Sequence, residues 1–434
     1  MSLRTLLNRL TSPRSPTLAG TWGAPLVLDR GQVGRPQIAM DDHGNAMAAW
    51  HHRGQAEEGV YICRYHAEYR SWDLVPRRLD GARTQAHAPE IAMNVRGEMA
   101  VVWQEQEGPQ VRICARHMLG AAETWVPHPR TLQALPGEVH SLHTGMDLAG
   151  NIHVVWCLGQ PGEYRIYTCG YHAEEGAWDA EPRTLGDPSP EPLFPQLAVD
   201  RGGQGLVVWS QKGAEPEDHR IVACHYDLGG QCWSDRPTLV AEGHASYLRM
   251  TLDGRGNAVV LWVEEGEAGV RALHASHLDG LTIEWTPAPR LTTGSAILWP
   301  LVGLDGQGRA HAVWRQESAG TMKLFTKRFV NGRWDDQRTP LVEDLGQSRA
   351  HALSVNAQGH ALVIWSQIQE AQSSVCLRRF DGAVWSARPI LLGAPGRKEI
   401  QDPGAALSPG GQVAAIWRQG DAGDAVIVCA VGQA

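Results

Sequence analysis

The stretch MDDHGNAMAAW, from Met40 to Trp50, recurs with few changes through the 434-residue chain. Seven further copies, from MNVRGEMAVVW to LSPGGQVAAIW, end at tryptophans spaced 51 to 53 residues apart. These repeat tryptophans are Trp50, Trp103, Trp156, Trp209, Trp262, Trp314, Trp365 and Trp417. A fixed period of about 50 residues indicates a repeat architecture, in which each unit buries its apolar faces against its neighbours.

Each copy predicts a tight turn between two antiparallel strands. An Asp, Asn or Ser opens the turn, as Asp41 does, and a glycine follows three residues later, as Gly44 does. Such side chains bond local backbone, and glycine takes the left-handed conformation that closes the turn. The apolar runs on either side of the turn are the two predicted strands. Runs such as VYICRYH supply a third strand, and a second tryptophan, usually followed four residues later by proline, marks a fourth.

Four antiparallel strands in each of eight repeats, without a helical pattern, predict an all-β fold. The architecture expected is a closed eight-bladed β-propeller. The last repeat stops after three strands, at AVIVCAVGQA, whereas TWGAPLVLD near the N-terminus carries Trp22 and Pro25 like a fourth strand. We therefore expect the last blade to be completed by an N-terminal strand, which makes residues 18–434 one propeller domain.

A small residue stands two positions before the turn residue in all eight repeats. This set is Ala39, Ala92, Gly145, Ala198, Thr251, Gly303, Ser354 and Ala406. We expect these small residues to make room for a large side chain of the neighbouring blade, such as its repeat tryptophan.

Residues 1–17 are expected to form an N-terminal extension with a short amphipathic helix. Its apolar face would be Leu3, Leu6, Leu7 and Leu10, and Pro13 would end it. The helix either docks on its own domain or binds a partner or a membrane surface.

Composition narrows the compartment and the partners. The net charge is −8 without a basic stripe, so a nucleic acid partner is not expected. No apolar run is long enough for a transmembrane segment, and no secretory signal is seen. Six of the eight cysteines occupy one matching place per repeat, too far apart to pair. Unpaired thiols favour a cytoplasmic protein; Cys157 and Cys232 receive no role, and no cofactor is expected.

From about Trp22 to its end the chain resembles the bacterial Trp-rich tandem-repeat β-propellers, a sialidase-like and lectin-like group. Their repeats read much like PQIAMDDHGNAMAAW. The resemblance implies the fold but not one activity, because propellers host many functions. Sialidases carry a Ser-x-Asp-x-Gly box, and quinoprotein dehydrogenases often carry adjacent cysteines. Neither motif is present here, so we expect a protein that is not an enzyme.

Three sets of residues are expected near the mouth of the propeller. Six positions before the turn, three successive repeats carry Phe194, Tyr247 and Trp299. This aromatic arc could stack on a sugar ring or grip an apolar side chain, with Gln196 and Arg249 nearby as hydrogen-bonding groups. The alternative is local packing of loops at the rim.

The second set stands two positions after the repeat tryptophan and includes Gln211, Gln316, Gln367 and Gln419. These glutamines either line a binding mouth or satisfy backbone groups in the adjacent turn. The third set is His87, His140, His143, His244 and His351. We predict no metal site, because a ring of eight blades would hold these imidazoles too far apart.

The leading functional hypothesis is a binding or scaffold propeller that docks a protein partner through its loop-rich face. One alternative is a glycan-binding lectin that uses the rim aromatics. A second alternative is an unrecognised hydrolase or lyase of the sialidase-like superfamily.

Overall fold

The computed structural model describes residues 22–54, 58–81, 85–120, 124–186, 192–212, 219–266, 269–287, 290–342, 347–393, 395–421 and 423–433. The predicted leucine-rich helix in residues 1–17, with Leu3, Leu6, Leu7 and Leu10, lies outside the described residues. The 38 elements of the described chain are all β-strands, which confirms the all-β class. A search of those residues found no helix with the length and apolar character needed to span a bilayer.

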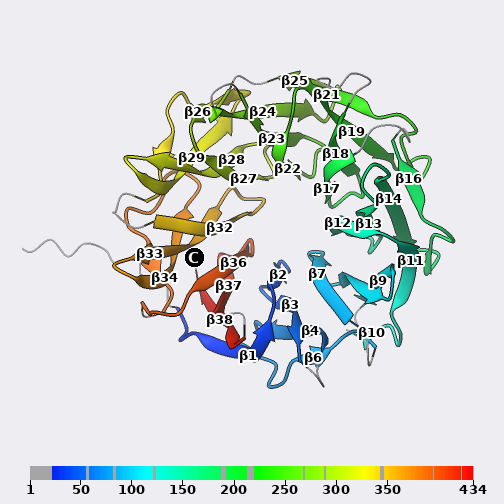
Figure 1. The fold of residues 1–434 in the computed structure, drawn as a ribbon, viewed down its shortest axis with the longest axis horizontal. Helices are drawn as coiled ribbons and strands as arrows, with labels where there is room; N and C mark the ends of the chain where they lie inside the picture. Colours follow the sequence, from blue (N-terminus) through cyan, green and yellow to red (C-terminus); the bar gives the residue numbers. More distant parts are fainter. Residues whose placement is uncertain are drawn as a thin grey trace, which may run out of the picture.

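The strands follow one another around a ring, with one strand of each repeat nearest the axis (Figure 1). These inner strands are β2 (Gln37–Met40), β7 (Gln85–Met93), β12 (Glu138–Met146), β17 (Pro192–Val199), β22 (Ser246–Leu252), β27 (Ile297–Leu304), β32 (Gln347–Val355) and β36 (Ile400–Leu407). The second strands, which carry the repeat tryptophans, are β3 (Ala46–Arg53), β8 (Met99–Glu107), β13 (Ile152–Gly159), β18 (Gly205–Lys212), β23 (Ala258–Glu265), β28 (Ala310–Ser318), β33 (Ala361–Gln369) and β37 (Gln412–Gln419).

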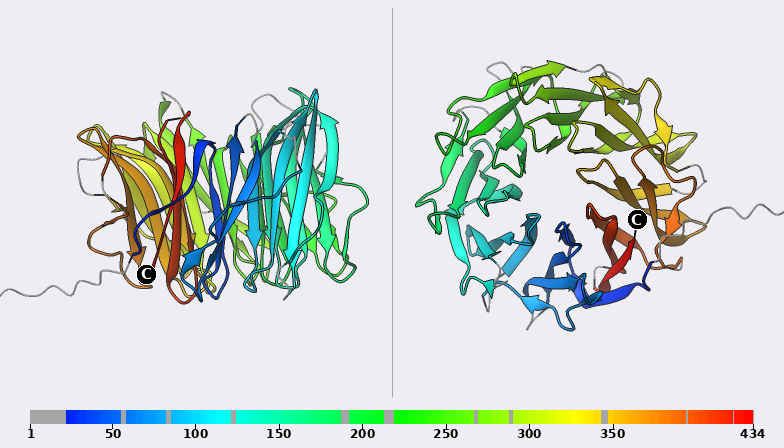
Figure 2. Two further views of the ribbon diagram at one scale, coloured as in Figure 1. Left: turned by 90° about the horizontal axis from the view of Figure 1, so that it is seen from below. Right: turned by 180° about the vertical axis from the view of Figure 1, so that it is seen from behind.

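Third and outer strands complete each sheet, and the strands run across the thickness of the ring (Figure 2). The third strands are β4 (Gly59–His66), β9 (Gln110–Leu119), β14 (Arg165–His172), β19 (His219–Asp227), β24 (Arg271–Asp279), β29 (Thr321–Val330), β34 (Gln372–Phe380) and β38 (Ala425–Gln433). The outer strands are short and mostly in two pieces: β5 (Ser71–Trp72) and β6 (Arg77–Arg78), β10 (Thr124–Trp125) and β11 (Arg130–Pro136), β15 (Ala177–Trp178) and β16 (Arg183–Leu185), β20 (Cys232–Trp233) and β21 (Thr238–Glu242), β25 (Glu284–Pro287) and β26 (Thr292–Gly294), β30 (Arg333–Trp334) and β31 (Thr339–Pro340), and β35 (Ile390–Leu391).

The described strands form seven hydrogen-bonded antiparallel sheets rather than eight separate ones. The first and last repeats share a nine-stranded sheet because β1 (Leu26–Val33) pairs with both. Residues from Leu26 to Gly31 pair with β38, and Gln32 and Val33 pair with β3. The N-terminal strand therefore lies beside the final strand of the chain.

The predicted turns form as the sequence indicates. In the first repeat, an oxygen of Asp41 accepts backbone N–H bonds from His43 and Asn45 at 2.9 and 2.8 Å. Gly44 has a φ of 85°, in the left-handed region. A Cβ on Gly97, the matching glycine of the second repeat, would lie 3.0 Å from Asp41 Oδ2. Asp41 thus serves its own hairpin and fits against the next repeat.

The second strands form the core by alternation. Trp103 and Met99 pack with residues of the first repeat, whereas Ala100 and Val102 pack in a cluster with Trp156 of the third. One strand thereby seals two interfaces. Seven of the eight thiols are buried and all eight are free, with Cys232 partly exposed.

The expected role of the small residues needs correction. A side chain on Gly145 would collide with Val199, and one on Gly303 would collide with Val355. Both valines stand just before the turn residue of the next repeat. The space therefore serves the inner strand of the neighbouring repeat and not its tryptophan.

Candidate functional site

The aromatic arc stands on β-bulges in three successive inner strands. The pairing with the second strand shifts between Leu193 and Gln196 in β17, and at the matching places in β22 and β27. Phe194, Tyr247 and Trp299 occupy these bulges with φ angles of 55, 54 and 55°. Left-handed backbone costs a bulky residue about 1 kcal/mol or more, and such strain concentrates at functional sites. Bulges also re-aim side chains.

The arc presents aromatic surface to solvent. Phe194 is 47% exposed and Trp299 is 49% exposed, although large apolar side chains are normally buried. The rings of Tyr247 and Trp299 are stacked, with centroids 5.9 Å apart and an interplanar angle of 29°. The structure therefore brings the fifth and sixth repeats together into one aromatic platform.

A polar residue follows two positions after the bulge site in five consecutive repeats. The set is Gln37, Glu90, His143, Gln196 and Arg249, from β2, β7, β12, β17 and β22. Gln37 Nε2 donates to Glu90 Oε1 at 3.0 Å, and the Nε2 atoms of Gln196 and His143 are 3.3 Å apart. Each contact links neighbouring repeats.

Charges from distant repeats also meet here. Arg35, just before β2, and Arg249, in β22, both act on the carboxyl of Glu90 and on the imidazole of His143. These residues lie in or just before β2, β7, β12 and β22, which are inner strands around the ring axis (Figure 1). We call Arg35, Gln37, Glu90, His143, Gln196 and Arg249, together with the aromatic arc, the axial site.

The axial site holds one group that can exchange a proton near neutral pH. Burial raises the pKa of Glu90 to about 7, although Arg35 and Arg249 oppose this shift. Burial lowers the pKa of His143 to about 4, and Arg249 adds to that effect. A carboxyl that titrates near the working pH, beside a neutral imidazole, is suited to general acid–base chemistry.

The raised pKa of Glu90 predicts a specific pH dependence of stability. The folded state holds this proton more tightly than the unfolded state, so its contribution is lost as pH rises from about 4.5 to about 7. Histidines whose pKa is lowered to about 4, such as His143, act in the opposite direction between about pH 4 and 6.5. The histidines are the same in wild type and in Glu90→Gln, so their contributions cancel when the two proteins are compared. The melting temperature of wild type minus that of the variant should fall across this window; a constant difference would contradict the assignment.

Three arginines near the arc lack a carboxylate partner among the described residues. None of the ion pairs among the described residues includes Arg35, Arg249 or Arg315. Arg249 donates a hydrogen bond to the backbone carbonyl of Leu248 at 2.7 Å. The Nε of Arg315, in β28, is buried without a hydrogen-bond partner. Arg315 pairs across the sheet with Leu298, the residue before Trp299, so this cation stands on the strand next to the platform.

Other arginines of the inner region are neutralised. Arg349 pairs with Glu399 at 2.7 Å, and Arg418 pairs with Asp402 at 3.0 Å. The free arginines therefore make the axial site positive, although the whole chain carries −8.

The second predicted set does not line this site. Gln211, Gln316, Gln367 and Gln419 accept the indole N–H bond of the repeat tryptophan two residues earlier, at 2.8, 3.0, 3.1 and 3.5 Å. They satisfy a buried donor, a role that differs from both of those considered above.

The five histidines of the third set do not converge. His140 packs against Tyr164 and His244 against His219, and burial lowers the pKa of His351 to about 3. Within the described ranges, no three His, Cys, Asp or Glu side chains are grouped to hold a metal ion.

Comparisons with known proteins identify the fold but no family. No family model and no curated protein matches the chain. The polysaccharide lyase Uly1 is similar over 97% of this chain and 94% of its own, with a TM-score of 0.50 and 9% identity. An ulvan lyase bound to -[GlcA(1-4)Rha3S]- is similar over 94% and 95%, with a TM-score of 0.50 and 12% identity. A Hadza microbial sialidase overlays less well, with a TM-score of 0.42 and 11% identity over 95% of each chain.

The similarities to the two lyases support a β-propeller fold and correct one expectation. The absence of two family motifs led us to expect a protein that is not an enzyme. That expectation is wrong, because the whole-chain structural neighbours include polysaccharide lyases.

Proposed function

We propose that this chain is a closed eight-bladed β-propeller that binds an acidic polysaccharide at the axial site and cleaves it by acid–base catalysis. The observation that carries this proposal is that an exposed aromatic platform, unpaired arginines and a titratable Glu90 all stand on or next to the inner strands. Eight repeats and the pairing of β1 with β38 support the ring. The polysaccharide lyase neighbours are similar to this chain in overall fold.

The aromatic platform and the arginines recognise different parts of a sugar. One ring of the polymer stacks its apolar face on Trp299 and Tyr247. Its carboxylate or sulfate lies against Arg249 and Arg315, whose guanidinium groups match the geometry of such anions. A neutral sugar would leave these cations unsatisfied, which makes the site selective.

The proton-transferring groups favour elimination over hydrolysis. Hydrolysis of a glycosidic bond generally uses two carboxyl groups. Glu90 supplies one, whereas Asp402 is held by Arg418 at 3.0 Å. In elimination, Glu90 takes the proton from the carbon next to the sugar carboxylate. The bond to the leaving oxygen breaks as a carbon–carbon double bond forms, and the proton passes to that oxygen. Arg249 stabilises the negative charge that develops on the carboxylate.

The product distinguishes this reaction from its alternatives. The protein is incubated with polygalacturonate, alginate and sulfated uronate polymers. Ultraviolet absorbance of the unsaturated sugar should rise with time on at least one of them. New reducing ends without that absorbance would indicate hydrolysis, and binding without either product would support a lectin. Failure to bind any of the polymers would overturn the proposal.

Replacing Trp299 by alanine should weaken binding of the polymer by roughly two- to tenfold, because an aromatic contact contributes about 0.5–1.5 kcal/mol. The fold should remain intact, since this side chain is 49% exposed. Calorimetric titration measures the affinity. Tyr69→Ala, at an aromatic residue 70% exposed outside the axial site, is the matched control and should bind like wild type. Equal loss in both variants would remove the arc from the site.

A further inference from the structure

The eighth repeat departs from the other seven at the place where it meets the first. Five positions after the turn residue, the second strand pairs with a third-strand residue that is large and apolar in seven repeats: Tyr65, Met118, Tyr171, Tyr226, Leu278, Phe329 and Phe380. In the eighth repeat the equivalent residue is Gly432. Trp22 bridges Gly432 and its indole covers it, because a Cβ there would lie 2.5 Å from the ring. Trp22 is therefore a single aromatic ring at this place, whereas five other repeats have a pair of aromatic rings there.

The neighbouring interfaces show what normally fills this region. The pair Tyr171 and Trp178, with ring centroids 5.4 Å apart, is covered by the imidazole of His117 from the preceding repeat, 4.3 Å from Tyr171. His153 covers Tyr226 in the same way at 4.4 Å, and His311 covers Phe380 at 4.6 Å.

The seam between the eighth and first repeats lacks that imidazole. The pair Tyr65 and Trp72 lies there, with centroids 5.5 Å apart. By strand register, Val431 stands where the second repeat has His117, and Ala414 stands where other repeats have His153 and His311. Two aliphatic residues and a glycine thus replace larger planar groups.

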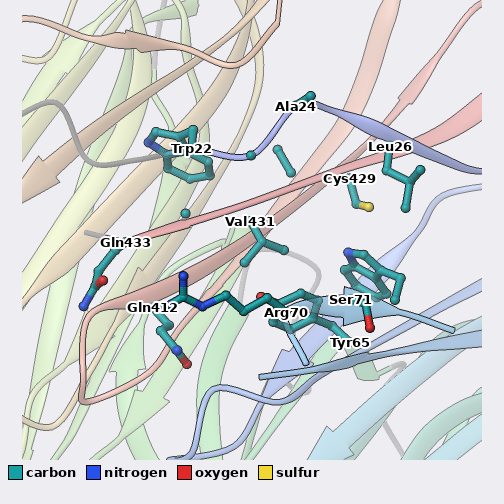
Figure 3. Close-up of a pocket in the computed structure, with 14 residues that line it drawn as sticks. Trp22, Ala24, Leu26, Tyr65, Arg70, Ser71, Gln412, Cys429, Val431 and Gln433 are labelled. Atoms are coloured by element: carbon teal, nitrogen blue, oxygen red, sulfur yellow. The ribbon is translucent and has the colours of Figure 1, made fainter. Parts of the chain in front are cut away.

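A cavity of about 630 Å³ results, which we call the seam cavity (Figure 3). Its lining includes Trp22, Tyr65, Arg70, Trp72, Gln412 and Gln433. In Figure 3, Val431 lies between Trp22 and Tyr65. None of these residues belongs to the axial site, so the cavity is a separate feature of the molecule.

We propose that the seam cavity binds a small planar aromatic molecule that carries an anionic group. The planar character follows from the imidazoles that lie 4.3–4.6 Å from the equivalent rings in three other interfaces. The anionic character follows from the polar lining. Arg70 lines the cavity and its side chain is exposed. The amides of Gln412 and Gln433 supply further donors.

Benzoate is the probe for this site, and cyclohexanecarboxylate is its non-planar match. Titration is followed by the indole N–H resonances of the ¹⁵N-labelled protein. Benzoate should shift the signals of Trp22 and Trp72, and cyclohexanecarboxylate should bind roughly two- to tenfold more weakly. Equal binding of the two acids, or shifts confined to other tryptophans, would overturn the proposal.

The repeats themselves supply the blocking variant. Val431→His installs the imidazole that His117 provides in the second repeat, and it should weaken benzoate binding at least roughly tenfold. Val384→His, at a valine 63% exposed elsewhere, is the matched control and should bind normally. Arg70→Gln, at an exposed residue, gives an independent reading if the first variant folds poorly and should also weaken binding. Unchanged affinity in both Val431→His and Arg70→Gln would contradict the assignment.

Discussion

Replacing Trp50 by alanine is expected to destabilise the protein by about 3–5 kcal/mol, as removal of a fully buried aromatic side chain does. Trp50 is 0% exposed and packs in a cluster that joins the first and eighth repeats. Its indole N–H donates to Asp29 Oδ2 at 2.6 Å, so the variant also deprives a carboxylate on β1 of a donor. One substitution therefore weakens both the core and the seam.

Thermal unfolding followed by circular dichroism measures this effect. The melting temperature should fall by roughly 3–6 °C, because a chain of 434 residues has a large entropy of unfolding. Trp299→Ala serves as the control, because it removes the same side chain from a half-exposed position. Equal melting temperatures of Trp50→Ala and wild type would show that the repeat tryptophans do not hold the interfaces together.

The second large effect is on catalysis. Glu90→Gln should lower the turnover rate by about 10²–10⁴-fold, the usual contribution of a general acid–base group. Glutamine keeps the size of the side chain and its contact with Gln37, but it cannot take up a proton. Affinity for the polymer should change little, because the platform and the arginines remain.

Initial rates and calorimetric titration on the same polymer separate these two quantities. Glu284→Gln, at an exposed position on the outer strand β25, is the matched control and should retain full activity. A Glu90→Gln variant with normal turnover would exclude Glu90 as the proton-transferring group, whatever its affinity.

The repeat pattern predicts much of the fold because each sheet obeys local rules. Asp41 and Gly44 determine a turn within five residues of sequence, and the alternation along a second strand determines its two packed faces. The N-terminal partner of the last strand could also be inferred, since Trp22 matches the outer-strand tryptophans. The nine-stranded sheet shared by the first and last repeats could not be inferred, because it depends on the pairing of the two final residues of β1 with β3.

The candidate site was only partly visible in the sequence. Phe194, Tyr247 and Trp299 were found from their common position, but their left-handed bulges are properties of strand register. Glu90 was missed although its position carries a polar residue in five consecutive repeats. Its significance depends on Arg249, three repeats away and across the ring. The spacing of the glutamines such as Gln316 was informative, but it reported a bond to the indole two residues earlier.

The most direct test of the axial site is calorimetric titration of the Glu90→Gln variant with acidic polysaccharides and with their methyl-esterified or desulfated neutral forms. The same titrations are then made with the double variant that also carries Arg249→Gln. At least one acidic polymer should bind, its neutral form should bind at least roughly tenfold more weakly, and loss of Arg249 should weaken the acidic polymer to a similar degree. Equal affinity for acidic and neutral forms, or no effect of Arg249→Gln, would contradict an axial site for anionic sugars.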